Sequence, residues 1–270
     1  MRLRCADKMT RIILIATMLA VIASLFNGCS TNTDSSLQTV LDSGQLVVGL
    51  DENFPPMGFR DDKGNLIGFD IDLAREVCKR LGISLKLQPV EWNRKEDELY
   101  SGRIDCIWNG MSVSADRRES MLLSQPYLEN ELVFAVRSYS SIQNINDLRG
   151  HKVGVQSGST TYEVIKDSEI YEDIEVVSQR DNLTLLEQLK NGEIDAALID
   201  SYVIYYIARN SEDFVLLSGA LAKEEIAIGF RKEDVELRNK IQDTLSQMRE
   251  DRTLDRISEK WFGSDITIVR

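Results

Sequence analysis

A short pattern occurs twice in this 270-residue chain and strongly limits the fold. At 99–105 and at 189–195 a leucine ends a helical pattern, a glycine stands three residues later, and Ile-Asp begins an apolar run. Glycine adopts the positive φ that closes a helix, so each copy predicts a helix, a tight turn and a buried strand. Looser copies precede strands expected at 46–50, 83–87 and 153–155. Helices that alternate with strands in this way indicate an α/β fold.

Side chains able to contact a ligand follow these strands, where each strand is expected to end. Ligands of open α/β sheets bind outside the carboxyl ends of the strands. The pattern therefore predicts that the residues able to contact a ligand lie around one crevice. These residues are Asp51, Trp92, Asn109 to Ser112, Ser157 to Thr160, and Asp200. Loops of this kind are common in any α/β protein, so a single position is weak evidence for a site.

The chain is expected to leave its first α/β unit and to return to it later. Residues 132–136 are typical of a strand that leaves the first unit, and 224–230 alternate like a strand, whose part at 226–230 is expected to return to it. Two crossings between two domains favour closure about a hinge. We therefore predict a first lobe formed by 37–133 together with 226–270, and a second lobe formed by 134–225.

Residues 1–28 are typical of an export signal. Positive residues precede an apolar run at 12–26, which is shorter than the roughly 20 residues that a spanning helix needs. Either Met1 or Met9 fits as the start of this segment. The segment predicts that the body of the protein lies outside the cytoplasmic membrane.

The next residues predict a lipid anchor. A glycine directly before Cys29 resembles the bacterial lipobox, in which the cysteine is lipidated and becomes the mature N-terminus. The match is imperfect, because Phe26 stands where such boxes usually have leucine. Polar residues at 30–36 are typical of a flexible tether, so 29–36 is predicted to connect the membrane to the domain. A secreted protein, or one anchored in another way, is the alternative.

Composition excludes several classes of function. The formal net charge is −12, and contacts to nucleic-acid phosphates need clustered Lys and Arg, so we expect no nucleic-acid partner. Metal-ligand spacings and cofactor motifs are missing, so we expect neither a metal nor a cofactor. The single histidine, His151, stands in a turn that we expect to face water. Cys78 and Cys106 fall on expected buried faces, and the sequence leaves open whether they are free or paired.

Five separated motifs occur in order along the chain: Gly68-Phe69-Asp70-Ile71-Asp72-Leu73, 110–117, 124–127, 154–160 and Lys260-Trp261-Phe262. Together they resemble the family 3 extracellular solute-binding proteins, the amino-acid receptors of ABC importers, over about 37–262. The resemblance implies a two-lobe, type II periplasmic-binding-protein-like fold, with a ligand cleft between lobes joined by two hinge strands. It further implies a monomeric, non-catalytic receptor that closes on an L-amino acid and delivers it to an ABC permease.

The resemblance also assigns the two charges of an amino acid to different lobes. Arg117 of the first lobe would hold the α-carboxylate by a forked pair of hydrogen bonds, helped by backbone N–H groups near Ser112 and Thr160. The ammonium would meet the carboxylate of Asp200 in the second lobe, the carbonyl of Gly110 and the hydroxyl of Ser112. Without the resemblance, Arg117 also fits a solvated arginine at a helix start, and Asp200 a helix N-cap.

Three further positions match those around the ligand side chain in similar receptors. Phe54 and Trp92 match aromatics on either side of it, which suit a flat or cationic group. Asp51 matches an acid that accepts a hydrogen bond from a side-chain nitrogen. Arginine, lysine or histidine is therefore the first expectation. Glutamine and cystine are alternatives, because Asn109 replaces the small hydroxyl residue of many relatives.

Two other functions use the same fold. Cyclohexadienyl dehydratases eliminate water from a cyclic substrate and need a positioned acid or base in the crevice. The histidine of this chain, His151, lies outside the expected cleft loops, and the pair Arg117 and Asp200 suits an amino acid better. A ligand-sensing domain that acts through a separate partner is the remaining alternative.

Overall fold

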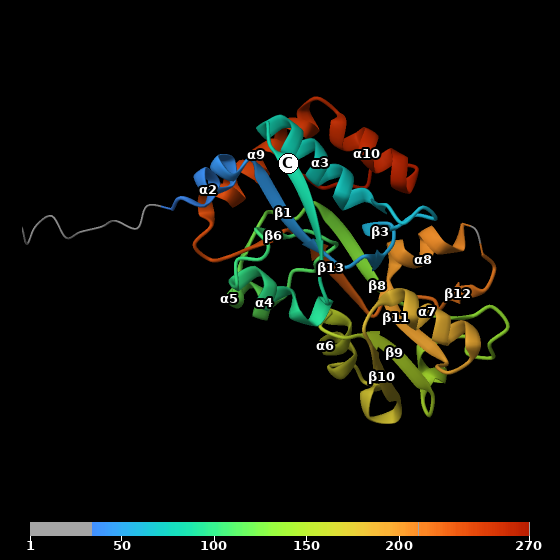
Figure 1. Ribbon diagram of the computed structural model, residues 1–270. Coiled ribbons are helices and arrows are strands. Elements are labelled where there is room, and N and C mark those ends of the chain that lie inside the picture. The colour runs from blue at the N-terminus through green and yellow to red at the C-terminus, as the bar shows by residue number, and fades with distance from the viewer. Residues whose placement is uncertain (1–33, 210, 270) are drawn as a thin grey trace, which may run out of the picture. The chain divides into compact units, whose positions relative to one another are not determined.

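The computed structural model describes residues 34–209 and 211–269, and Figure 1 shows their helices and strands. Ser35–Arg270 form a compact unit. The predicted export signal at 1–28, Cys29 and most of the predicted tether lie outside the described residues. Within the described part, none of the helices has both the length and the hydropathy that a membrane span requires.

The first sheet contains the strands that the helix–glycine–strand pattern predicts near the start of the chain. β1 (Gln45–Leu50) pairs in parallel with β5 (Ser84–Pro89) on one side and with β6 (Cys106–Ile107) on the other. β14 (Gly229–Phe230) lies antiparallel between β6 and β7 (Leu122–Leu123). The sheet is therefore mixed, in the order β5-β1-β6-β14-β7.

Helices from both ends of the chain cover this sheet. α3 (Phe69–Leu81) packs on β1 and β5, and also contacts α9 (Val235–Glu250) and α10 (Thr253–Phe262). Asp70 and Asp72 lie in the first turn of α3, where the helix dipole favours acids. The remaining elements of this part are α2 (Ser36–Ser43), β2 (Asn53–Phe54), β3 (Gly58–Arg60), β4 (Leu66–Ile67), η1 (Trp92–Arg94), α4 (Lys95–Tyr100) and α5 (Ala115–Ser120).

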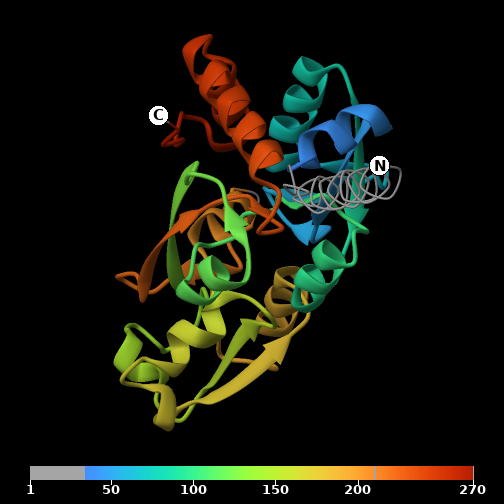
Figure 2. The same ribbon diagram turned by 90° about the vertical axis from the view of Figure 1, so that its left-hand side faces the viewer.

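The second sheet is built around β8 (Leu128–Arg137), which pairs antiparallel with β11 (Ala196–Asp200) on one side. On its other side β8 pairs antiparallel with β12 (Phe214–Leu216) and β13 (Ala222–Ile226). Figures 1 and 2 show the elements of the two sheets in separate halves of the unit. The remaining elements of this half are η2 (Ile145–Leu148), β9 (Lys152–Gln156), α6 (Thr160–Lys166), η3 (Tyr171–Asp173), β10 (Glu175–Gln179), α7 (Asn182–Asn191) and α8 (Ser201–Ala208).

The repeated Ile-Asp pattern has the same structural role in both sheets. The carboxylate of Asp105 accepts the backbone N–H of Val47 at 2.7 Å, and that of Asp195 accepts the N–H of Lys152 at 3.0 Å. In each copy the backbone N–H of the aspartate also donates to the carbonyl of the same partner. The glycines that precede them have φ of 75° and 79°. The aspartate thus fixes the start of one parallel strand against its neighbour.

The prediction of one strand at 224–230 is wrong. β13 ends at Ile226 in the second sheet, and β14 begins at Gly229 in the first. Between them Ile226 forms an isolated bridge with Ser112, and the N–H of Ala227 donates to the carbonyl of Met111 at 2.9 Å. The chain changes sheets here, so its backbone cannot keep one set of strand partners. The exact lobe boundaries remain predictions.

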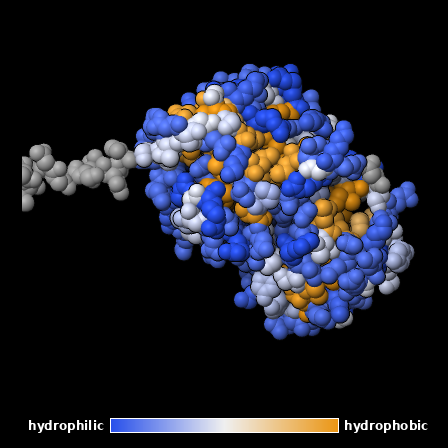
Figure 3. Space-filling view, in the orientation of Figure 1, coloured by the Kyte–Doolittle hydropathy of each residue, from blue (hydrophilic) through white to orange (hydrophobic). Residues whose placement is uncertain are grey.

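Apolar side chains fill cores on both sides of this crossing. Leu46, Leu73 and Leu245 belong to one cluster, which continues to Ile199 of the second sheet, and Leu132, Phe134 and Val153 belong to another. On the face drawn in Figure 3, hydrophilic residues predominate and hydrophobic residues form separate patches. Cys78 and Cys106 are buried and free, and burial raises the pKa of the Cys78 thiol to about 12. Both thiols therefore act as small apolar groups.

The backbone at Gly68, at the start of α3, leaves no room for a Cβ atom. Its φ is 153°, and a Cβ there would lie 2.1 Å from the carbonyl oxygen of Met57. We expect Gly68→Ala to lower the free energy of unfolding by about 3 kcal/mol, measured by urea denaturation. Gly64→Ala is the matched control, because its φ is 80° but a Cβ meets nothing within 4 Å. Equal losses in the two variants would contradict this account.

Candidate functional site

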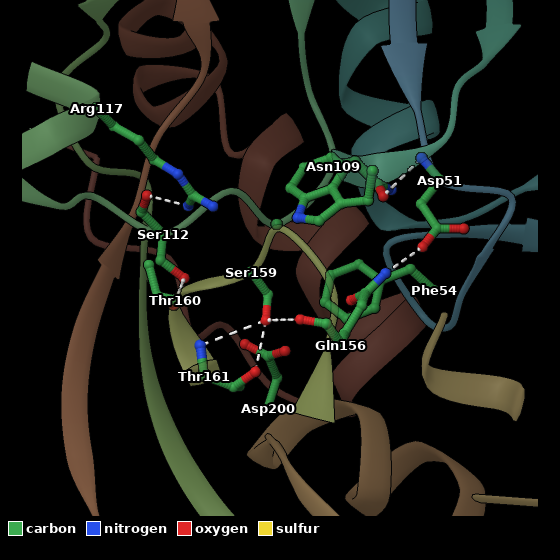
Figure 4. A pocket seen from close by; sticks show the side chains of 12 residues that line it. Asp51, Phe54, Asn109, Ser112, Arg117, Gln156, Ser159, Thr160, Thr161 and Asp200 are labelled. Carbon is green, nitrogen blue, oxygen red and sulfur yellow. Dashed lines mark hydrogen bonds between the residues drawn. The ribbon is translucent and has the colours of Figure 1, made fainter. Parts of the chain in front are cut away.

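A narrow cavity, with about 10 Å³ of free space, lies where the two halves of the unit meet. Figure 4 shows its side chains converging from both sheets. The residues that line it are Asp51, Phe54, Trp92, Asn109, Gly110, Ser112, Arg117, Gln156, Ser159, Thr160, Thr161 and Asp200.

The cavity brings together all but one of the side chains predicted to bind a ligand. The exception is Ser157, which lines two neighbouring cavities and whose N–H donates to the carbonyl of Gln179 at 2.7 Å. Ser157 lies just beyond the end of β9, and its contact with a ligand remains a prediction. Its neighbour Ser159 lines the cavity, together with Gln156 and Thr161, which were not predicted.

Arg117 is buried at the cavity wall. Ser114 caps α5 by accepting the backbone N–H of Arg117, and the arginine side chain is 6% exposed. Its Nη1 donates to the carbonyl of Ser112 at 2.6 Å, and its Nη2 donates to the carbonyl of Gly158 at 3.2 Å. Burial lowers the pKa of Arg117, although arginine stays charged. The alternative of a solvated arginine describes Arg118 instead, whose side chain is 61% exposed.

Asp200 ends β11 directly before α8, and its carboxylate makes no N-cap hydrogen bond. It accepts instead from Asn130 Nδ2 at 2.6 Å and from the hydroxyl of Tyr202 at 3.3 Å. Burial, with a contribution from the charge of Glu224, raises the pKa of Asp200 to about 7. Asp200 thus occupies the N-cap position of α8, but its carboxylate does not cap the helix and lines the cavity instead.

Glu224, on β13, contacts residues of the site and was not predicted. Its Oε2 accepts the hydroxyl of Ser112 at 2.8 Å and lies 3.4 Å from Asn130 Nδ2. The amide of Asn130 thus bridges the carboxylates of Glu224 and Asp200. Thr160 Oγ1 donates to Ser112 Oγ at 3.3 Å across the cavity. In this structure the hydroxyl of Ser112 is directed to Glu224 rather than to the cavity centre.

The far end of the cavity holds an aromatic pair and an acid. Figure 4 shows Asp51 and Phe54 on the side of the cavity away from Arg117. Asp51 accepts the N–H of Asn53 at 2.9 Å and Gln156 Nε2 at 2.7 Å, and burial raises its pKa to about 6. Trp92 is buried beside them. This end combines a carboxylate with aromatic surface, as expected for a cationic or amide side chain.

Contacts join the two halves across the cavity. Gln156 donates to Asp51, and both Lys95 and Arg117 donate to Gly158, at 2.7 to 3.2 Å. These pairs connect elements of the first sheet with elements of the second. The structure therefore shows the cleft closed.

Solved structures match this arrangement over most of the chain. The crystal structure of Tv2483 bound to L-arginine has a TM-score of 0.85 at 30% identity, covering 87% of this chain and 98% of that one. An ABC uptake transporter substrate-binding protein from Streptococcus pneumoniae, solved with bound histidine, has a TM-score of 0.81 at 34% identity, covering 88% and 99%. The predicted two-lobe α/β fold is confirmed by this likeness.

Sequence comparison leads to the same family. The L-cystine-binding protein TcyJ of Escherichia coli K12 is 31% identical over 258 residues, covering 93% of this chain and 96% of that protein. The model of the bacterial extracellular solute-binding proteins, family 3, matches residues 46–264. Members of this family are extracellular solute-binding proteins. This chain belongs to the bacterial extracellular solute-binding proteins, family 3.

Proposed function

We propose that this protein is a receptor for a free L-amino acid, held between Arg117 and Asp200. The observation that carries the proposal is that these two buried side chains have opposite charge and come from opposite lobes. Neither forms an ion pair with another described residue. An α-amino acid supplies a carboxylate for one and an ammonium for the other, so it stabilises the closed state more than the open state.

A basic side chain fits the far end of the cavity best. The carboxylate of Asp51 would accept from a guanidinium, ammonium or imidazole group that lies between Phe54 and Trp92. Relatives and structural neighbours bind L-arginine, histidine or L-cystine. Arginine, lysine or histidine is the first choice of ligand, and glutamine and cystine are alternatives because Asn109 and Gln156 offer amide contacts.

The receptor would act in import rather than in catalysis. The paired charges match the two charges of a free amino acid, which the protein would deliver to the permease of an ABC importer. The sequence around Cys29 supports lipid attachment to the outer face of the cytoplasmic membrane. Labelling with a fatty-acid analogue tests this anchor, since Cys29→Ser should remove the label.

A thermal-shift screen tests the binding function. The unit from Ser35 onward would be melted with each of the twenty amino acids, cystine, ornithine and citrulline. A ligand at one hundred times its Kd stabilises by about 2.7 kcal/mol, which raises the melting temperature clearly. The matched control is the α-amide of each active amino acid, which lacks the carboxylate. A screen in which none of these compounds shifts the melting temperature would reject the proposal.

A further inference from the structure

Lys95, at the start of α4, is a buried cation that the binding scheme above does not use. Its side chain is 4% exposed. Its Nζ donates to the carbonyl of Trp92 at 3.2 Å and lies 5.0 Å from the centroid of the indole ring. Lys95 is thus tied to the aromatic residue that lines the ligand cavity, although it does not line that cavity itself.

The same ammonium reaches the second lobe. Lys95 Nζ donates to the carbonyl oxygen of Gly158 at 3.0 Å, and Arg117 Nη2 donates to this oxygen at 3.2 Å. The backbone approach is close, because a Cβ on Gly158 would lie 2.6 Å from Cα of Asn93. Two positive charges of the first lobe therefore share one neutral acceptor of the second lobe, across the closed cleft.

The acids around this pair do not neutralise it at close range. Among the described residues, neither Lys95 nor Arg117 forms an ion pair. The charged groups that face Lys95 are Arg117 on α5, Glu96 on its own helix and Glu163 on α6. Arg117 also faces Glu224 and Asp200, which hydrogen-bond to other groups. Burial, and then the charge of Arg117, lower the pKa of Lys95 to about 8. Closing the cleft without a ligand thus buries two like charges, which is unfavourable.

We propose that Lys95 is a specificity-determining residue that makes closure depend on an anionic group of the ligand at Arg117. This inference rests on the proposed function. The α-carboxylate of an amino acid would sit against Arg117 and compensate the charge of both cations. A ligand without that carboxylate leaves both charges uncompensated in the closed state. Lys95 acts through Arg117 and Trp92, so it is a positioning residue rather than a direct ligand contact.

The test compares Lys95→Met and Lys95→Arg with wild type, using L-arginine and L-argininamide as probes. Wild type should bind the acid much more tightly than the amide. In Lys95→Met this preference should fall by about tenfold, within the range typical of coupling between sites. Lys95→Arg keeps the charge and should keep the preference. Lys86→Met, at an exposed position on β5, is the matched control and should behave like wild type.

A second readout needs no ligand. Fluorescence energy transfer between dyes on the two lobes should show a larger closed population in ligand-free Lys95→Met than in wild type. An unchanged acid-to-amide ratio together with unchanged ligand-free closure would overturn the inference, while wild-type binding of L-arginine would leave the receptor function intact. If wild type binds neither probe, the proposed function fails for arginine. The closed population measured by energy transfer without ligand then still tests the role of Lys95. Lys95→Gln replaces Lys95→Met if the latter does not fold.

Discussion

Replacing Arg117 with alanine is expected to raise the Kd for the amino-acid ligand by at least about 150-fold, equivalent to 3 kcal/mol or more. The ligand carboxylate would then be buried in the closed cleft without a cation or a forked donor. The carbonyl of Ser112 would lose the Arg117 donor as well, and that of Gly158 would keep only Lys95. Isothermal titration with the ligand found in the screen measures this loss.

The matched control is Arg118→Ala. Arg118 is the next residue on the same helix, but it is exposed and lies 3.8 Å from Glu225. Exposed ion pairs contribute about 1 kcal/mol or less, so ligand affinity should change by less than about fivefold. Both variants should unfold cooperatively in the absence of ligand. Equal affinities of Arg117→Ala and wild type would contradict the assignment of the carboxylate site.

The local pattern of the sequence was sufficient to predict most elements of the fold. Glycine after a leucine, followed by Ile-Asp, specifies a helix end and a strand start through short-range rules. Asp105 and Asp195 show why this works, because each aspartate binds the backbone of the strand beside it. The change of sheets after Ile226 was not predicted, because alternation of polarity reports burial but not which neighbour supplies the hydrogen bonds.

The sequence predicts those residues of the site whose side-chain chemistry alone suggests contact with a ligand. The resemblance to solute-binding receptors points to Arg117 and Asp200, and both line the cavity. Glu224, Asn130 and Lys95 were missed, because their roles arise from contacts with residues 63 to 112 positions away. No local rule reports such pairings. They become visible only when the two lobes are brought together.

Ionisation of Asp200 is expected to make the affinity for the ligand strongly dependent on pH. In the ligand-free protein, burial raises its pKa from 3.8 to about 7, so the closed fold favours the protonated form. The ionised carboxylate costs stability progressively as pH rises from about 4 to 7. A ligand ammonium reverses this preference, because it stabilises the charged form and lowers the pKa. Binding therefore releases a proton below pH 7, and affinity should fall by up to about tenfold per pH unit below that value.

Titrations with the same ligand at pH 5 and pH 7.5 measure this effect, and Asp200→Asn separates it from other groups. The asparagine cannot ionise, so its weaker binding should be nearly independent of pH over this range. Asp70 is the internal comparison, because its pKa is also raised to about 7 by burial. Its carboxylate is held by the N–H of Gly110 and the hydroxyl of Tyr127, and it does not line the cavity. Asp70 should therefore affect the pH dependence of unfolding and not that of ligand binding. A wild-type affinity for the ligand that is equal at pH 5 and pH 7.5 would exclude Asp200 as the ammonium site.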